Sequence, residues 1–286
     1  MSKIDLHMHT TYSDGTKTPE ELVTYIKSFG VRIAAVTDHD ITDGTKKAIE
    51  AGKGLGVEMI PGIEINCLHN GNRMEILGYY IDPDNKPLNN KISEMRNFRE
   101  TRLDRIIDKL KSLNMEILKE RVMEIAGEGS IGRPHIARAL LEKGYVNTQA
   151  EAFDKYLADG KSCNVDRMKL SAQEAISLIR GAGGVAVHSH PGFFKGGNLK
   201  KHFHELAQSG LRGIEVIYPY PDSFRYPDNS SRAESFFNFL KQVGKENNLL
   251  LTGGTDFHGD NDYKELLDCV DIPAEWINRL KEAVNK

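Results

Sequence analysis

The stretch Ile4-Asp-Leu-His-Met-His9 is a short apolar run that closes on two histidines, and the polar residues 10–15 follow it. Alternate residues of a β-strand point to the same face and lie roughly 6.5 Å apart along it. His7 and His9 can therefore reach one cation from the same side. The stretch predicts a strand at 4–9 that carries metal ligands at its end.

Helix and strand signals alternate through much of the chain. Thr18-Pro-Glu-Glu21 has the pattern of a capping box with proline at the first helical position, and Gly30 ends the helix that follows. Ser171 and Glu174 repeat the capping pattern before a helix at 171–179. Further strands are expected at 32–37, 57–65, 74–80, 185–188, 213–218 and 249–252, and further helices at 45–55, 199–209, 231–245 and 273–285. About seven strands alternating with helices predict an α/β fold with a mostly parallel sheet, which closes most economically into a barrel.

Residues 86–167 interrupt this alternation. They show helical periodicity and alternating charges, without a convincing strand pattern. We therefore expect a small helical insertion at 86–167, which divides the barrel into a first part at 1–85 and a second part at 168–286.

Composition narrows the class of protein. The 286 residues are 39% hydrophobic, which is enough for a substantial core. A net charge of −3, from 38 basic and 41 acidic residues, gives no general attraction to nucleic acids or membranes. The three cysteines form no CxxC pair, so neither a disulfide framework nor a thiolate zinc site is expected. We expect a cytoplasmic protein with no membrane segment and no obligate protein partner.

Acidic and imidazole side chains recur where the predicted strands end. Besides His7 and His9, they are Asp14, His39, Glu64, His190, Asp256 and His258. In parallel α/β barrels the chemistry gathers at the C-terminal ends of the strands, so these side chains are expected to meet. Histidine and carboxylate ligands without thiolates suit zinc, manganese or iron, and bridging carboxylates hold two cations close enough to clamp a phosphate. The pattern predicts a hydrolytic centre with several metal ions.

These motifs together resemble those of the PHP (polymerase and histidinol phosphatase) superfamily over nearly the whole chain. They are Asp5-Leu-His-Met-His9, Ser13-Asp14-Gly15, Thr37-Asp38-His39-Asp40, Gly62-Ile-Glu64, Ser189-His190-Pro191 and Thr255-Asp256-Phe257-His258. The resemblance implies a distorted (β/α)7 TIM-like barrel, two or three divalent ions (manganese, zinc or iron) and hydrolysis by metal-activated water. The block with Gly132-Arg-Pro-His135 resembles the insertion of stand-alone PHP phosphoesterases that act on nucleoside 3′,5′-bisphosphates and short RNA 5′ ends.

The resemblance also implies which residues hold which ion. One ion would be held by His7, His9, Glu64 and Asp256. A second would be held by Asp14, His39 and His258, with Glu64 and Asp256 as bridging carboxylates.

A third ion would be held by Glu64, His190 and a histidine near the end of the fourth strand. This chain departs from the pattern there, because Glu75 stands at the position of that histidine. A carboxylate can still ligate and favours a harder cation. His188 lies two residues before His190, so it is either an alternative ligand or a packed histidine.

Cationic residues of the helical block are candidates for substrate phosphate binding. Arg133 and Pro134 stand where a helix should begin, and the free backbone N–H groups there favour anions. His135 comes two residues after Arg133 in that helix and is a further candidate for phosphate binding. Lys161 could neutralise a second phosphate. The alternatives are a surface salt bridge for Arg133 and a solvated Lys161. Arg133 would offset charge in the transition state, and His190 or a metal-bound water would protonate the leaving oxygen.

The favoured function is hydrolysis of a phosphate ester of a nucleoside 3′,5′-bisphosphate or a short oligoribonucleotide. Asp256, His190 and Arg133 are the expected catalytic residues. One alternative is a phosphatase or cyclic phosphodiesterase for a small ribose or sugar phosphate. Another, from a different class, is a non-catalytic binding domain stabilised by metals. The expected partner is a small phosphorylated substrate or a short RNA.

Overall fold

The computed structural model describes residues 3–127, 131–165, 170–221, 224 and 233–284. Eight strands among them form one sheet in the order β1-β2-β3-β4-β6-β7-β8, with β5 paired to β3. The strands are β1 (Lys3–Asp5), β2 (Val31–Val36), β3 (Glu58–His69), β4 (Asn72–Tyr79), β5 (Leu170–Ser171), β6 (Val185–His188), β7 (Gly213–Ile217) and β8 (Leu250–Gly253). Only β4 runs antiparallel to its neighbours, so the expected α/β fold with a mostly parallel sheet is confirmed.

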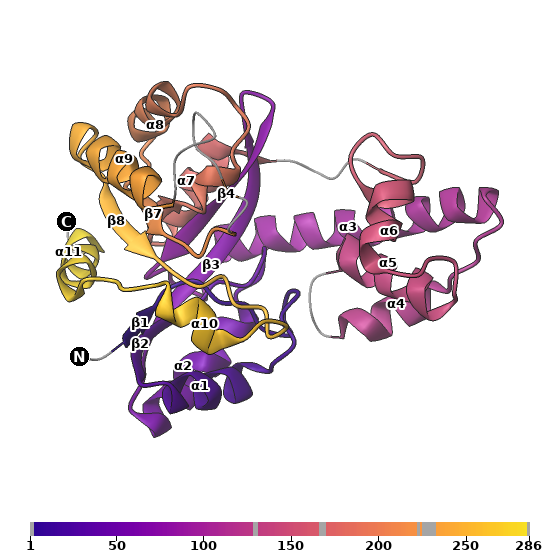
Figure 1. Ribbon diagram of the computed structural model, residues 1–286, viewed down its shortest axis with the longest axis horizontal. Helices are drawn as coiled ribbons and strands as arrows, with labels where there is room; N and C mark the ends of the chain where they lie inside the picture. The colour runs from indigo at the N-terminus through magenta and orange to yellow at the C-terminus, as the bar shows by residue number, and fades with distance from the viewer. Residues whose placement is uncertain (1–2, 128–130, 166–169, 222–223, 225–232, 285–286) are drawn as a thin grey trace.

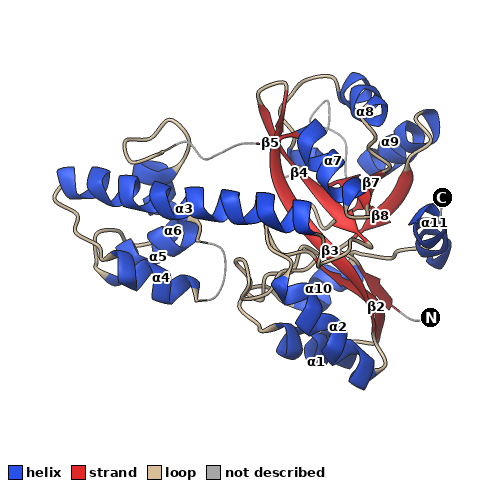
Figure 2. Cartoon of the chain, turned by 180° about the vertical axis from the view of Figure 1, so that it is seen from behind, coloured by secondary structure: helices blue, strands red, loops and turns tan. Residues whose placement is uncertain are grey.

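Helices cover the sheet on its outer side (Figures 1 and 2). They are α1 (Pro19–Ser28), α2 (Asp43–Leu55), α7 (Ala172–Gly181), α8 (Leu199–Gln208), α9 (Ala233–Glu246), α10 (Tyr263–Asp268) and α11 (Ala274–Val284). Both predicted capping boxes are present, with Thr18 bonding to Glu21 and Ser171 to Glu174. The apolar faces of α7 and α9 pack on the strands, where Ile76, Val187 and Ile214 are fully buried.

A second group of helices lies to one side of the sheet, and the long helix α3 (Lys86–Ser112) connects the two parts (Figure 1). The other members are α4 (Lys119–Ala126), α5 (Arg133–Glu142), α6 (Gln149–Ala152) and the π-helical turn η1 (Phe153–Leu157). Leu103, Ile106 and Leu140 belong to a hydrophobic cluster of their own within this group. The regular elements described between 86 and 165 are therefore all helical, as the periodicity predicts, and turns and loops connect them.

The segments that follow β1 and β8 meet. His9 N donates a hydrogen bond to Phe257 O (2.9 Å), and Asp256 N donates one to His7 O (2.8 Å). Met8 and Phe257 form an isolated parallel bridge. Two segments from opposite ends of the sheet order thus lie side by side, and both carry predicted metal ligands.

The hairpin between β3 and β4 corrects the expected placement of two ligands. Strand β3 continues to His69, so Glu64 lies inside the strand and not at its end. Glu75 lies near the beginning of β4, which reaches the same edge of the sheet because β4 runs antiparallel. The two-residue turn Asn70-Gly71 has φ angles of 50° and 79°, which is the Asn-Gly hairpin signature. The expectation that every ligand lies at the C-terminal end of a strand was wrong for Glu64 and Glu75.

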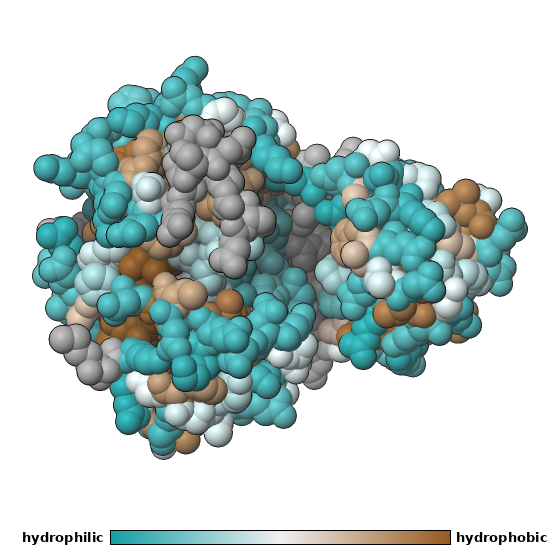
Figure 3. Space-filling view, in the orientation of Figure 1, coloured by the Kyte–Doolittle hydropathy of each residue, from teal (hydrophilic) through white to brown (hydrophobic). Residues whose placement is uncertain are grey.

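Other boundaries also differ from expectation. Strand β1 ends at Asp5 and leaves the histidines after it in an extended segment, and helix α10 had no predicted counterpart. The expected helix start at 231–232 lies outside the described residues. Figure 3 shows a mainly hydrophilic face with hydrophobic atoms in small separate patches. None of the described helices is both long and apolar enough to span a membrane.

Candidate metal centre

The side chains predicted as metal ligands converge at one edge of the sheet. Among the described residues they form four overlapping groups, and the ligand atoms within each group lie within 4.8 Å of one another. The groups are His9, Asp14, His39 and His258; His7, His9 and Asp256; His7, Glu64 and His190; and His39, Glu64 and Glu75. The structure therefore brings all the residues predicted as ligands into one centre.

Glu64 lies in the middle of this centre and its side chain is fully buried. Its Oε2 lies 3.0 Å from His39 Nδ1. The same oxygen lies 3.4 Å from Nε2 of both His7 and His9. Its Oε1 lies 3.3 Å from His190 Nε2. A carboxylate that faces four imidazoles is well placed to bridge neighbouring ions.

Asp256 is the second central carboxylate. Its Oδ1 lies 3.2 Å from His7 Nε2 and 3.0 Å from His9 Nε2. Its backbone φ is 54°, in the left-handed region that residues other than glycine rarely adopt. Beyond it, His258 Nε2 lies 3.2 Å from Asp14 Oδ1. This strained turn after β8 thus aims one carboxylate and one imidazole into the centre.

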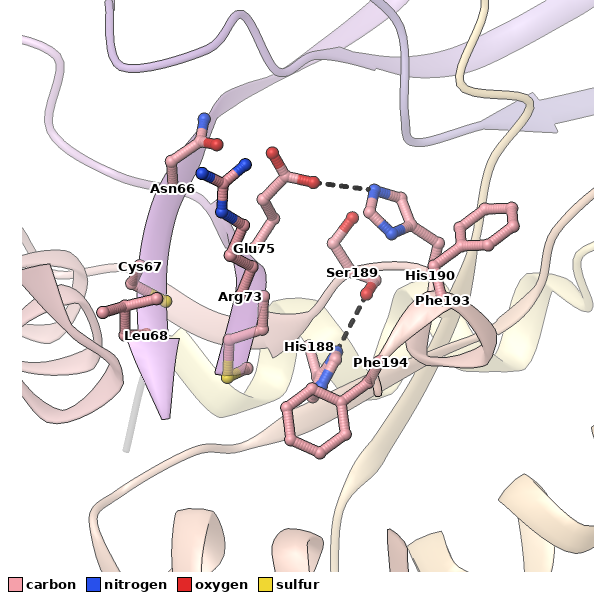
Figure 4. A pocket seen from close by; sticks show the side chains of 11 residues that line it. Asn66, Cys67, Leu68, Arg73, Glu75, His188, Ser189, His190, Phe193 and Phe194 are labelled. Atoms are coloured by element: carbon pink, nitrogen blue, oxygen red, sulfur yellow. Dashed lines mark hydrogen bonds and ion pairs between the residues drawn. The ribbon is translucent and has the colours of Figure 1, made fainter. Parts of the chain in front are cut away.

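Glu75 and His190 form the third side of the centre (Figure 4). Glu75 Oε2 lies 3.2 Å from His190 Nε2, and Glu75 Oε1 lies 4.0 Å from His39 Nδ1. The carboxylate therefore stands between two imidazoles, where the family pattern would place a histidine. It supplies a ligand atom to the group with His39 and Glu64.

The electrostatics show how strongly the carboxylates favour positive charge here. Burial opposes protonation of His39, but Asp14 and Glu64 outweigh burial and raise its pKa to about 10. Burial also opposes protonation of His190, but hydrogen bonds to Glu64 and Glu75 hold its pKa well above the ordinary value. The centre is thus built to hold cations, either as protons on imidazoles or as metal ions.

Unsatisfied oxygens point to the same conclusion. Asp14 Oδ1 and Glu64 Oε2 are buried and form no hydrogen bond of normal geometry among the described residues, and the groups nearest to them are imidazole nitrogens at 3.2 Å and 3.0 Å. A buried carboxylate oxygen without a donor is costly unless a cation lies next to it. The donor set of imidazoles and carboxylates fits manganese, zinc or iron.

Buried carboxylates that the sequence analysis did not single out orient the ligands. Glu215 on β7 is fully buried; its Oε1 lies 2.9 Å from His7 Nδ1, and its Oε2 accepts a 2.7 Å bond from His190 N. Asp38 accepts three hydrogen bonds of 2.7 Å from residues 10–13. A partner such as Glu215 fixes the ring orientation and tautomer of a metal-binding histidine, whereas Asp38 holds in place the segment that precedes Asp14. The sequence feature that could have identified Glu215 is a single carboxylate in the otherwise apolar strand β7.

A pocket of about 210 Å³ opens between the metal centre and the helical block. Metal-centre residues line one side of it. Cationic or polar residues of α3 and α5 line the other. The residues that matter for the argument are Asp14, His39, Glu75, Arg102, Arg133 and His135. The pocket therefore joins carboxylate and imidazole ligands to two guanidinium groups.

The substrate-binding candidates are placed differently from one another. Arg133 begins α5, as predicted, and its Nη1 donates to Leu157 O (2.9 Å). His135 accepts a bond from Gly132 N at Nδ1 (3.1 Å) and so caps the helix. Arg102, which the sequence analysis missed, is 7% exposed and lines the same pocket. Lys161 is exposed and is not among the residues that line this pocket, so its role stays a prediction.

His188 is packed away from the ligand groups. Its Nε2 lies 2.9 Å from His202 Nε2, and its Nδ1 lies 2.8 Å from Ser189 O. It belongs to none of the four groups. Both nitrogens are engaged, which favours the packed histidine over the alternative ligand.

Comparison with known proteins places the chain in a family. A family model described as PHP domain matches residues 5–162. The 5′-3′ exoribonuclease Rnm of Salmonella typhimurium is 36% identical over 274 residues, covering 94% of this chain and 90% of the relative. The 3′,5′-nucleoside bisphosphate phosphatase of Chromobacterium violaceum is 29% identical over 261 residues, covering 90% and 88%.

A solved structure from Bifidobacterium adolescentis, of a protein assigned as a metal-dependent phosphoesterase, matches with a TM-score of 0.78 and 28% identity. The match covers 95% of this chain and 98% of that protein. The expectation of a metal-dependent phosphoric ester hydrolase is thereby confirmed at the level of the family: the chain belongs to the PHP domain family.

Proposed function

We propose that the protein hydrolyses a phosphate ester of a nucleoside 3′,5′-bisphosphate or of a short oligoribonucleotide. The observation that carries the proposal is the pocket in which Arg102 and Arg133 face the ligands of the metal centre. A substrate with one phosphate at the metal centre would present a further phosphate to guanidinium groups, which bind phosphate in a bidentate manner.

We assign two or three divalent ions, of manganese, zinc or iron, to the centre. The first would be held by His7, His9, Glu64 and Asp256, and the second by Asp14, His39 and His258. The third would be held by Glu64, Glu75 and His190, since His190 Nε2 lies 3.3 Å from Glu64 Oε1 and 3.2 Å from Glu75 Oε2. When bound, such ions polarise phosphoryl oxygens and lower the pKa of water toward neutrality.

Side chains of the protein would stabilise the developing charge, orient the ligands and supply a proton. Arg133 binds the further phosphate, and its positive charge also offsets part of the negative charge that develops on the phosphoryl group at the metal centre. Asp256 is oriented by Tyr218, whose hydroxyl donates to its Oδ2 (2.9 Å). His190 Nε2 lies between Glu64 and Glu75, so it holds a proton that the leaving oxygen can take when no ion occupies the third position.

Two features of the fold belong to the same proposal. The hydrogen bonds between the segments after β1 and β8 support closure of the sheet as a distorted (β/α)7 barrel. The separate core of the helical block, together with its contribution of Arg133 to the pocket, supports residues 86–167 as an inserted substrate lid.

The test is phosphate release by the manganese-loaded protein. Adenosine 3′,5′-bisphosphate is compared with AMP, a ribose cyclic phosphate and a short 5′-phosphorylated RNA. We expect preference for the bisphosphate or the RNA, loss of activity in Asp256→Ala and weaker substrate binding in Arg133→Ala. The matched control is Arg138→Ala, which removes an arginine of the same helix whose side chain is 60% exposed and forms an ion pair with Glu142.

Other outcomes would select the alternatives. Faster turnover of the cyclic phosphate or of AMP would favour a small sugar phosphate as substrate. Metal binding without turnover of any ester would favour the non-catalytic domain. Equal losses in Arg133→Ala and Arg138→Ala would remove the argument for the pocket.

A further inference from the structure

A carboxylate of the helical block bridges two arginines beside the metal centre. Asp159 Oδ1 accepts a hydrogen bond from Arg73 Nη2 (2.6 Å) and another from Arg133 Nη1 (3.0 Å). Arg73 belongs to β4 and Arg133 to α5. One anion thus joins cations from the sheet and from the helical block.

Both arginines are held next to the metal ligands. Arg73 and Glu75 are two residues apart on β4, so they share one face of the strand, and Figure 4 shows both side chains beside the same pocket. That pocket has a volume of about 250 Å³. Glu75 and Asn66 line it and also line the pocket that contains Arg133, so the two pockets adjoin.

Arg133 is held more firmly than the carboxylate that bridges the two arginines. Arg133 is 14% exposed, donates to Leu157 O and lies over the Phe153 ring at 5.9 Å, so its position is fixed. Asp159 is 52% exposed and lies in a turn closed by a bond from Lys161 N to Ala158 O. The carboxylate is therefore the part of this bridge that is easiest to displace.

Within the bridge, one carboxylate meets two guanidinium groups. Two guanidinium groups carry two positive charges and the carboxylate carries one negative charge. Burial opposes ionisation of Asp159, but Arg73 and Arg133 outweigh it and lower the pKa of the carboxyl. A phosphate dianion would match both arginines in charge and offers more acceptor oxygens than a carboxylate.

We propose that Arg73 and Arg133 form the subsite for the substrate phosphate that is not hydrolysed, and that Asp159 holds this subsite closed until the phosphate displaces it. The inference rests on the proposed function and deepens it, because it names Arg73 as a specificity-determining residue. Asp159 then lowers the affinity for substrates with two phosphates, which must displace it, whereas a substrate with a single phosphate binds while the bridge stays closed.

The test compares Asp159→Asn and Arg73→Gln with the wild type. We expect the ratio of kcat/KM for adenosine 3′,5′-bisphosphate over AMP and 3′-AMP to rise about threefold to tenfold in Asp159→Asn and to fall about tenfold in Arg73→Gln. The change should lie in KM. The matched control is Asp154→Asn, which removes an exposed carboxylate of the same segment.

A second readout separates this inference from the proposed function. Calorimetry with adenosine 3′,5′-bisphosphate and protein in excess chelator measures affinity without turnover. We expect the highest affinity for Asp159→Asn, a lower one for the wild type and the lowest for Arg73→Gln. A wild type that turns over no ester but shows this order would refute the proposed function alone. Equal affinities in the wild type, Asp159→Asn and Arg73→Gln, or equal losses for all three substrates, would overturn the inference and leave the bridge as a structural contact.

Discussion

The stability of the metal-free protein should fall as pH rises from about 6.5 to 9. His258 lies between two carboxylates, with Nε2 3.2 Å from Asp14 Oδ1 and Nδ1 3.7 Å from Asp256 Oδ1. Burial opposes its protonation, but Asp14 and Asp256 outweigh burial and raise its pKa from 6.5 to about 9. Between these two values the folded state holds more protons than the unfolded state, so the free energy of unfolding decreases with pH.

The size of the effect follows from the shift. One pKa unit corresponds to about 1.36 kcal/mol, so a change from 6.5 to about 9 is worth about 3 kcal/mol for His258. This contribution is fully present below pH 6.5 and is lost by pH 9. His39, with a pKa raised to about 10, adds to the loss with the same sign.

The assay is urea unfolding in excess chelator at intervals from pH 6 to 9. Measurement stops there because burial also raises the pKa of the Cys67 thiol above its ordinary value of 9.0, which would add a separate loss. His258→Asn should remove about 3 kcal/mol from the pH dependence. His204→Asn, which changes an exposed histidine of α8, is the control.

Manganese should reverse the trend. Metal ligands must release protons, so metal affinity rises with pH and the loaded protein keeps its stability where the metal-free protein loses it. A metal-free protein whose unfolding free energy is constant or rises between pH 6.5 and 9 would refute the reasoning. So would a His258→Asn variant with the same slope as the wild type.

Three further predictions concern the metal centre and its support. Asp256→Asn should lower kcat/KM at least about a hundredfold and reduce bound manganese, measured by phosphate release and elemental analysis; wild-type values for both would contradict its central position. Glu75→Gln should lose about one equivalent of manganese in a folded protein, and unchanged stoichiometry would remove Glu75 from the ligands. Gly254→Ala should cost about 2–3 kcal/mol in urea unfolding, because its Cβ would meet His7 Cβ at 2.3 Å. Gly54→Ala, with nothing within 4 Å, should instead gain about 0.5–1 kcal/mol, and similar values for the two variants would contradict the contact.

The parts of the structure that depend on local patterns could be read from the sequence. The capping boxes at Thr18 and Ser171 fix two helix starts by contacts three residues apart. The strand ends supplied most of the ligands, because parallel strands deliver their last residues to one edge. The Asn-Gly pair at 70–71 is a hairpin signal that the sequence analysis did not use. It predicts the antiparallel β4, which brings Glu75 to the centre.

The remaining features of the site depend on contacts between residues that are far apart in the sequence. The role of Glu215 depends on a bond to His7, 208 residues away. The bridge from Asp159 to Arg73 spans 86 residues and joins two different cores. The local sequence around a single charged residue in a strand or a turn does not indicate which distant residue it contacts. These contacts could therefore be identified only from the folded structure.

The meeting of the segments after β1 and β8 has a consequence for how the protein is made. Thr255 N donates to Asp5 Oδ1 (2.9 Å) across 250 residues, and Asp256 N donates to His7 O. A ribosome delivers the first histidines about 250 residues before their partners. Contacts of such large sequence separation form slowly, since loop closure must precede them. Assembly of the complete ligand set is therefore a late step, and a nascent chain that has not reached residue 258 lacks the ligands that complete the centre.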